Sequence, residues 1–202
     1  MSGDTHAAAG AAVGLALCVS LPAIAVGSTS QMICCVGAAV IGALCPDLDV
    51  DKSKGNKIMD KALLIGIPAA VLLYFIMKRT GRSLSSINVD VEQIVMLLLF
   101  LGLCLFFRTR PHREASHSLL MMAVTTLCVY SFAGSNLWLW FGSGYLSHLL
   151  LDYFNTKGES LIWPMPGKFC LGLVTASGTA DKVVKYACYL AVALLLVKGV
   201  LG

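Results

Sequence analysis

Histidine and aspartate residues stand at the ends of apolar segments in this sequence, where their side chains could bind a metal ion. The chain contains four histidines, and each lies beside or just inside the end of an apolar segment: His6, His112, His117 and His148. Acidic residues occur at the same places, namely Asp47, Asp49, Glu114 and Asp152. Neutral imidazole and carboxylate are ligands that hold zinc and similar divalent ions. The sequence therefore predicts a divalent metal site, provided that the segments bring these side chains together.

His148 and Asp152 form the strongest local pattern. They are four residues apart, so on a helix they stand one turn apart on one face and can reach the same ion. An ionisable pair at the end of an apolar helix is costly unless it is partnered or binds a metal, which marks it as a functional candidate. The alternative is structural: Asp152 ends the helix at the interface, and His148 makes a hydrogen bond between helices.

Asp47 and Asp49 follow Pro46, which is expected to end the apolar helix before it. We expect an irregular turn in which both carboxylates face one side, because residues two apart on an extended segment point the same way. The alternative for these aspartates is a solvated loop or a cap on the next helix.

His112 and His117 are five residues apart, about 140° around a helix, so one continuous helix would not direct both at one ion. Pro111 favours a turn or a helix start, which leaves His112 in the approach segment and His117 near the first turn of the next helix. Taken singly, both also fit basic residues that anchor a helix at the membrane interface, and His6 fits a frayed terminus. The joint pattern favours a metal centre.

Long apolar segments separated by charged loops predict an all-α membrane protein. Of the 202 residues, 57% are hydrophobic and only 13% are charged, and the mean hydropathy is +0.80. This composition excludes a disordered chain and an ordinary soluble domain, which carries about 25% charged residues. We expect a polytopic transmembrane helical bundle of six to seven apolar helices, some short or re-entrant, in a single domain over residues 1–202. The apolar segments are 7–26, 31–45, 62–77, 94–107, 118–133, 137–151 and 183–201.

The basic residues lie at segment ends, which indicates membrane topology rather than a nucleic-acid partner. If the first six segments all cross the membrane, the N-terminus and the loops 46–61, 108–117 and 152–182 lie on the same side of it. That face and its edge collect eleven of the fifteen basic residues: Lys52, Lys54, Lys57, Lys61, Arg108, Arg110, Arg113, Lys157, Lys168, Lys182 and Lys185. By the positive-inside rule, the face with the candidate ligands is cytoplasmic, although the basic cluster at 78–82 opposes this orientation.

Small residues and cysteines add three further expectations. Gly142, Ser143, Gly144 and Ser147 predict a helix face that a neighbouring helix approaches closely. The eight cysteines contain no CxxC pair, so we expect reduced thiols and no Cys-type zinc site. Because residues 1–6 contain no Lys or Arg, the first apolar segment is expected to be a retained helix rather than a signal peptide.

The motifs resemble those of the YdjM-like inner-membrane proteins, a family described as membrane-bound metal-dependent hydrolases. Four stretches carry the resemblance: Thr5-His6 with Gly10, Pro46-Asp47-Leu48-Asp49, His112-Arg113 with His117-Ser118, and Gly144 through Asp152 followed by Gly158 and Trp163-Pro164. Together with the resemblance, the residue pattern implies that one to three divalent ions, with zinc expected, are held by His6, Asp47, Asp49, His112, His117, His148 and Asp152.

Two positions depart from the family pattern. Val50 stands where many relatives have His, and Glu114 stands where they have Gly. A missing ligand at position 50 would lower the number or affinity of bound ions unless Asp51 or Glu114 substitutes. The order of the ligands also resembles, more distantly, the zinc-dependent phospholipase C and P1 nuclease group.

The resemblance implies hydrolysis of an ester or phosphodiester by a metal-activated water. Asp47 and Asp49 are the catalytic candidates, which would bridge ions or orient the water, and Arg113 would pair with a phosphate oxygen of the substrate. A site at the membrane edge suits a membrane lipid or another lipid-borne small molecule. Nothing like a Gly-x-Ser-x-Gly elbow surrounds Ser118 or Ser147, so we expect these hydroxyls to support ligands or pack helices.

Two non-enzymatic alternatives remain open at this point. A metal or ion transporter would place polar residues at several depths, whereas the segments 94–107 and 118–133 have no acidic, basic or His residue in their interiors. A structural metal clamp would hold helix ends together without turnover.

Overall fold

The computed structural model describes residues 1–20, 28–50, 53, 55–61, 90–133 and 136–201. These residues form helices and connecting turns, and the only β pairing among them consists of two isolated bridges in the segment between residues 155 and 174. The elements with defined bounds are α1 (Gly3–Ser20), α2 (Thr29–Leu44), η2 (Pro46–Asp49), α4 (Val91–Arg108), η4 (Ala115–His117), α5 (Leu119–Ala133), α6 (Leu137–Tyr153) and α7 (Thr179–Leu201). The predicted all-α class is confirmed for the described residues.

Six of the seven predicted apolar segments correspond to helices in the structure. The remaining segment, 62–77, lies outside the described residues. Residues 46–61, predicted as a loop, contain a short 3-10 helix, η2, and a helical stretch over 55–61. The turn after Pro46 is therefore helical rather than extended, because proline fixes a φ angle that suits the first position of a helix.

Side-chain caps explain where several helices begin. The Ser28 hydroxyl accepts a hydrogen bond from the Gln31 amide at 3.2 Å at the start of α2. The Ser118 hydroxyl accepts one from the Met121 amide, also at 3.2 Å, at the start of α5. Each cap satisfies an amide that has no partner inside the helix. Ser118 therefore has a structural role, in line with its predicted support of neighbouring groups.

Small residues allow α1, α2 and α6 to cross closely. A Cβ atom added at Gly144 would overlap the backbone carbonyl of Ala39, and one added at Gly42 would overlap the carbonyl of Phe141. At Gly14, an added Cβ would lie 2.7 Å from the Ala39 methyl group. The Trp140 indole N–H then donates to the Gly14 carbonyl at 3.1 Å. The close approach predicted for the small residues of α6 is confirmed at Gly144, which meets α2, whereas Gly142 faces Thr126 of α5.

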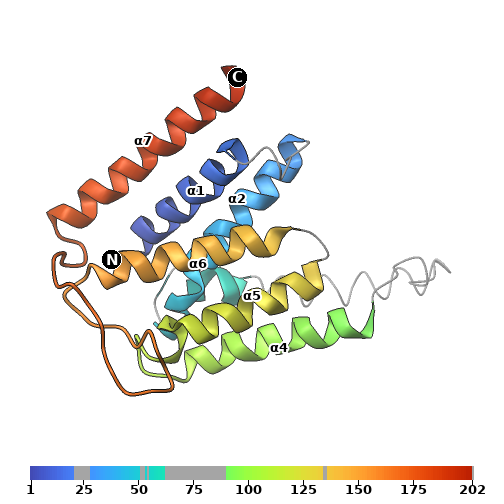
Figure 1. Ribbon diagram of the computed structural model, residues 1–202, viewed down its shortest axis with the longest axis vertical. Helices are drawn as coiled ribbons and strands as arrows, with labels where there is room; N and C mark the ends of the chain where they lie inside the picture. The colour runs from blue at the N-terminus through green and yellow to red at the C-terminus, as the bar shows by residue number, and fades with distance from the viewer. Residues whose placement is uncertain (21–27, 51–52, 54, 62–89, 134–135, 202) are drawn as a thin grey trace.

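The helices pack in a chain of neighbours, as Figure 1 shows. The helix α2 contacts both α1 and α6, while α6 also contacts α5, and α5 contacts α4. The helix α7 packs against α1 at the opposite edge from α4. A hydrophobic core next to η2 includes Leu48, Phe107, Phe141, Tyr145 and Leu149. This arrangement brings the first turn of α1, the end of α2 and the last turns of α6 to one end of the molecule.

Among the described helices, α4 alone is both long and apolar enough to cross a membrane. The helices α2 and α5 are also apolar but shorter. The sequence predicts six or seven apolar helices, some of them short, and the number of complete crossings stays a prediction.

Candidate metal centre

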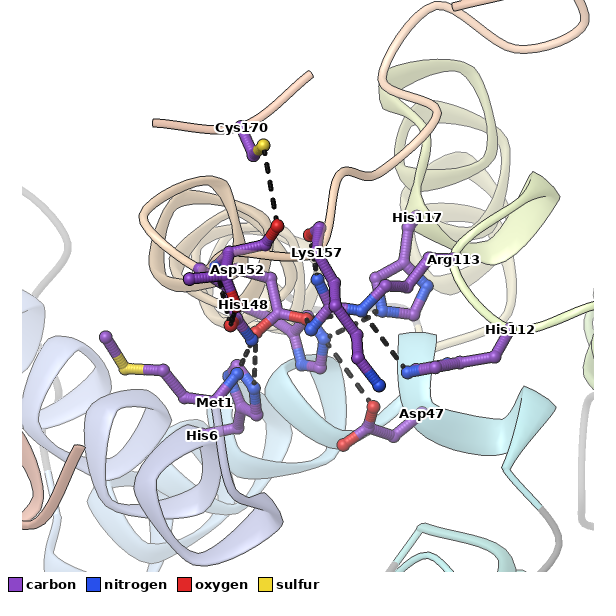
Figure 2. A network of polar contacts seen from close by, with 12 residues as sticks. Met1, His6, Asp47, His112, Arg113, His117, His148, Asp152, Lys157 and Cys170 are labelled. Atoms are coloured by element: carbon purple, nitrogen blue, oxygen red, sulfur yellow. Dashed lines mark hydrogen bonds and ion pairs between the residues drawn. The ribbon is translucent and has the colours of Figure 1, made fainter. Parts of the chain in front are cut away.

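Six of the predicted ligands meet at one end of the helices, as Figure 2 shows. Their ligand atoms form three overlapping groups, and within each group the atoms lie within 4.8 Å of one another. The groups are His6 with Asp47 and His148, Asp47 with His112 and His117, and His117 with His148 and Asp152. Side chains from α1, η2, the turn before η4, η4 and α6 therefore converge on one centre, as the sequence predicts.

The ring nitrogens of His117 and His148 face each other across the centre. The two Nε2 atoms lie 3.2 Å apart. His148 Nδ1 lies 2.7 Å from the Ala43 carbonyl oxygen, which accepts only, so Nδ1 carries the proton and Nε2 a lone pair. Two lone pairs at this separation repel each other unless a positive charge lies beside them. This arrangement would suit two ligands of one metal ion.

His117 has the same tautomer for a separate reason. The Ser116 hydroxyl donates to Asp49 Oδ2 at 2.6 Å, so it accepts the hydrogen bond from His117 Nδ1 at 2.9 Å. The Nδ1 atom also lies 3.3 Å from Asp49 Oδ2. A carboxylate behind an imidazole fixes the ring and strengthens the opposite nitrogen as a ligand.

His6 is fully buried, and its ring nitrogens make no hydrogen bond with the described residues. Its ring stacks on His148, with centroids 3.7 Å apart and an interplanar angle of 17°. His6 Nε2 lies 3.2 Å from Asp152 Oδ1, yet neither nitrogen of the ring makes a hydrogen bond. A buried polar atom without a partner costs about 1–3 kcal/mol. A bound cation would give the His6 ring a ligand contact in addition to its ion pair with Asp152.

Asp47 and His112 lie at the mouth of the centre. Asp47 Oδ1 is 3.8 Å from His148 Nε2, and the His112 side chain is 40% exposed. Both residues line a polar cavity of about 390 Å³, whose wall also includes Ser2, Asp4, Val50 and Ser53. A molecule entering from outside would therefore meet these two ligands first.

Asp49 lies behind the histidines and belongs to none of the three groups in the described chain. Its carboxylate accepts hydrogen bonds from His112 Nδ1 at 2.7 Å and from the Arg113 amide at 3.1 Å. Burial alone would raise the pKa of Asp49, but hydrogen bonds from His112 and His117 and the charges of these rings hold it well below its usual value. The geometry therefore gives Asp49 the task of orienting two histidines.

Arg113 is buried inside the site. Its Nη2 atom lies 2.5 Å from Asp152 Oδ2, its Nη1 donates to the Lys157 carbonyl, and its Nε donates to His112 Nε2 at 3.3 Å. The residue has a φ angle of 67°, which turns the backbone so that its own amide reaches Asp49. Arg113, which the sequence analysis predicted to bind substrate, thus forms an ion pair with Asp152, a candidate metal ligand.

The comparison with protein families identifies this chain. The family model described as YdjM inner membrane protein matches residues 1–201. The chain belongs to the YdjM inner membrane protein family. Neither the curated proteins nor the solved structures gave a match. The family name supports an inner-membrane location, while the likeness to phospholipase C and P1 nuclease remains one of ligand order.

The two departures from the YdjM pattern, at Val50 and Glu114, lie next to the short 3-10 helices η2 and η4. Val50 follows η2 and lines the polar cavity beside Asp47. Glu114 precedes η4 and belongs to none of the metal-ligand groups in the described residues. Asp51, the other predicted substitute ligand, lies outside the described residues.

Glu159 is a site residue that the sequence analysis missed. It is fully buried, and neither carboxylate oxygen makes a hydrogen bond. Burial and the nearby charge of Asp152 raise its pKa to about 9, against the opposing charge of Arg113. The sequence contains only a weak indication of its role, namely that Glu159 is the only acidic residue between Asp152 and Asp181. In the YdjM chain, this raised pKa favours the protonated form of Glu159 at neutral pH, close to Asp152 and Arg113 of the candidate metal centre.

Asp181 was also missed and supports the centre from α7. Its carboxylate accepts a hydrogen bond from the Thr5 hydroxyl at 2.7 Å and one from the Ser177 amide at 2.8 Å. Thr5 precedes His6 in the first turn of α1. Asp181 therefore fixes the turn that carries the ligand.

The remaining predictions concern serines and cysteines. The Ser147 hydroxyl donates to the Gly144 carbonyl at 2.7 Å within α6, which is a packing role. All eight cysteines lie in described residues and are free thiols, and the three ligand groups contain His and Asp.

Proposed function

We propose that this protein is a membrane-bound hydrolase that depends on a divalent ion, with zinc as the expected ion. Its substrate is a lipid-borne ester or phosphodiester. The observation that carries the proposal is the opposed pair of His117 and His148 Nε2 atoms, 3.2 Å apart, beside the buried His6 ring, whose nitrogens make no hydrogen bond with the described residues. This donor set of imidazoles and carboxylates matches the preference of zinc.

The ligands divide by their access to the cavity. The buried ligands are His6, His117, His148 and Asp152, and the accessible ones are Asp47 and His112. When bound, a divalent ion supplies a water that ionises near neutral pH and polarises the scissile bond. Asp47 is placed to orient the attacking water, because it alone combines a carboxylate in two ligand groups with a position on the cavity wall.

Arg113 supports a preference for phosphodiesters. Its guanidinium lies between Asp152 and His112, beside the proposed reaction centre. An Asp152 carboxylate that serves as a ligand offers less charge to Arg113, so the guanidinium becomes available to a phosphate oxygen in a bidentate fork. Glu159, protonated at neutral pH, lies near the same charges and is placed to return a proton to the site.

We further propose a multi-pass arrangement with the metal centre on the cytoplasmic side of the inner membrane. The positions of the basic residues support this orientation. The polar cavity supports an enzyme over a metal clamp, because it gives a substrate access to Asp47 and His112.

The test is hydrolysis by detergent-purified protein loaded with zinc or manganese. A chromogenic phosphodiester and vesicles of phospholipid serve as substrates. We expect Asp47→Asn and His148→Ala to lower kcat/KM by about 10²-fold or more, while Ser147→Ala retains activity because its hydroxyl bonds within α6. Activity that survives both ligand substitutions and chelation would overturn the proposal, as would ion flux through sealed vesicles without any hydrolysis.

A further inference from the structure

A second cavity lies beside the metal centre and differs from the first in chemistry. Its volume is about 230 Å³, and its lining is almost wholly apolar. It lies between α2, η2, the helical residues 55–61 and α4, and is bounded by Leu44, Leu48, Ile58, Leu101 and Cys104 among others. We call it the apolar slot. It offers no charged group to a ligand, so it fits a hydrocarbon.

The apolar slot and the polar cavity are separated by one turn of chain. Within η2, Asp47 lines the polar cavity, and the next residue, Leu48, lines the apolar slot. The same division holds after η2, where Ser53 lines the polar cavity and Ile58 lines the slot. One segment therefore presents a hydrocarbon surface on one side and candidate metal ligands on the other.

This pairing matches the shape of an amphiphile. A lipid has a polar group joined to a hydrocarbon chain, so the two ends would occupy different cavities on either side of η2. One wall of the slot is formed by α4, the described helix that is long and apolar enough to span a membrane. If α4 spans the membrane, the slot lies next to lipid acyl chains. Ile58 is 52% exposed although it lines the slot, which places it at the rim.

We propose that the apolar slot binds one acyl chain of a lipid substrate whose scissile group lies in the polar cavity beside Asp47. This inference rests on the proposed function and names the substrate class of the same site. The slot then selects lipids by acyl chain, while the metal centre acts on the bond that joins the chain-bearing part to the polar group.

The first experiment measures binding without any turnover. The probe is phosphatidylglycerol, a phosphodiester lipid, with a diazirine in one acyl chain, added in trace amount to the purified, metal-loaded full chain in detergent. After irradiation, the labelled peptides are identified by mass spectrometry, with and without unlabelled phosphatidylglycerol. We expect competed labelling of peptides that contain Ile58 and Leu101.

Two tryptophan substitutions separate the slot from the general lipid surface. Ile58→Trp narrows the rim and should lower the competed labelling at least tenfold. Ile33→Trp is the matched control, because Ile33 is 66% exposed on α2 and does not line the slot. Leu101→Trp fills the slot from the α4 side and should repeat the loss. Unchanged unfolding temperatures in all three variants show that the fold persists.

Labelling that no competitor reduces, or that Ile58→Trp and Leu101→Trp leave unchanged, overturns the inference. Turnover then separates the two proposals. In Ile58→Trp, KM for a long-chain lipid should rise at least tenfold, with hydrolysis of a short soluble phosphodiester unchanged. Competed labelling of the slot without hydrolysis of either substrate would sustain the slot and refute the hydrolase. Hydrolysis of both substrates with an unchanged KM in Ile58→Trp would refute the slot alone.

Discussion

The helices α4 and α6 face their surroundings in opposite ways. On α4, large apolar side chains such as Leu98 and Leu105 point outward and are more than half exposed. On α6, glycine and serine permit contact with α2, and His148 and Asp152 are buried at the far end. The helix that is long and apolar enough to span a membrane thus carries no site residue, whereas α6, which carries two of the candidate ligands, is not among the described helices that meet this description.

This difference shows that the helix with the exposed apolar surface and the helix with the candidate ligands are not the same helix. A lipid-facing surface requires large apolar side chains, which raise hydropathy. A buried metal centre requires backbones that approach closely, and this depends on small residues that contribute little hydropathy. Glycine therefore indicates the functional helices of this chain better than leucine does.

The largest expected effect compares glycines on these two helices. Gly144→Ala should destabilise the protein by at least about 1–3 kcal/mol, because its Cβ would overlap the Ala39 carbonyl. It should also abolish metal binding. Gly102→Ala on α4 has open space around the new methyl group and should stabilise by about 0.5–1 kcal/mol through helix propensity. Chemical denaturation in detergent measures both changes, and equal effects would refute the comparison.

The second prediction tests whether Asp49 acts behind the ligands. Asp49→Asn leaves the three ligand groups intact but removes the charge that orients His112 and His117. Metal affinity should fall by about 10–100-fold, the usual result of losing such a partner. Isothermal titration with zinc measures the change. A complete loss of binding would instead make Asp49 a direct ligand.

The third prediction concerns the proton on Glu159 in the metal-free protein. Its folded pKa of about 9 lies above the reference value of 4.5, so its protonated form stabilises the fold. This contribution is fully present below about pH 4.5 and is lost as the pH rises through about 9. The unfolding temperature should therefore decline across this window.

Glu159→Gln supplies the control for that decline. The amide stays neutral at every pH, so the variant should show a flatter profile and should exceed the wild type in stability near pH 9. Identical profiles for the two proteins would show that Glu159 ionises normally.

The smallest effect on the free energy of unfolding is expected at the exposed ion pair between Asp60 and Arg108. Asp60 pairs with Arg108 at the end of α4 at 2.7 Å, and the Asp60 side chain is 56% exposed. Asp60→Asn should change the free energy of unfolding by less than about 1 kcal/mol, because solvent screens such pairs. The same denaturation assay applies, and a larger loss would mean that this exposed pair contributes as much to stability as the buried centre.

The sequence predicted the described helices and the candidate ligand residues from local patterns, and it predicted that the ligands meet by placing the segment ends on one face. The spacing of His148 and Asp152 placed them on one face, and Gly144 indicated the close crossing. The sequence did not predict the position of Asp49 behind the histidines, because that depends on the direction of two 3-10 turns.

Glu159 escaped prediction for a different reason. It lies in the long connection after α6, which folds back on the site through contacts between distant backbone atoms. The Ser160 amide donates to the Arg113 carbonyl at 3.2 Å, and the Leu119 amide donates to the Leu161 carbonyl at 3.0 Å. Neither contact leaves a periodic pattern in the sequence.

The most direct test of the metal centre is elemental analysis of the detergent-purified protein. Wild type, His148→Ala and Asp152→Asn would be compared, with Ser147→Ala as a neighbouring control on α6. We predict a stoichiometric divalent ion in wild type and Ser147→Ala, and its loss from both ligand variants while their helical content persists. Wild-type protein that contains no divalent ion, and that added zinc or manganese neither binds nor stabilises, would contradict the account.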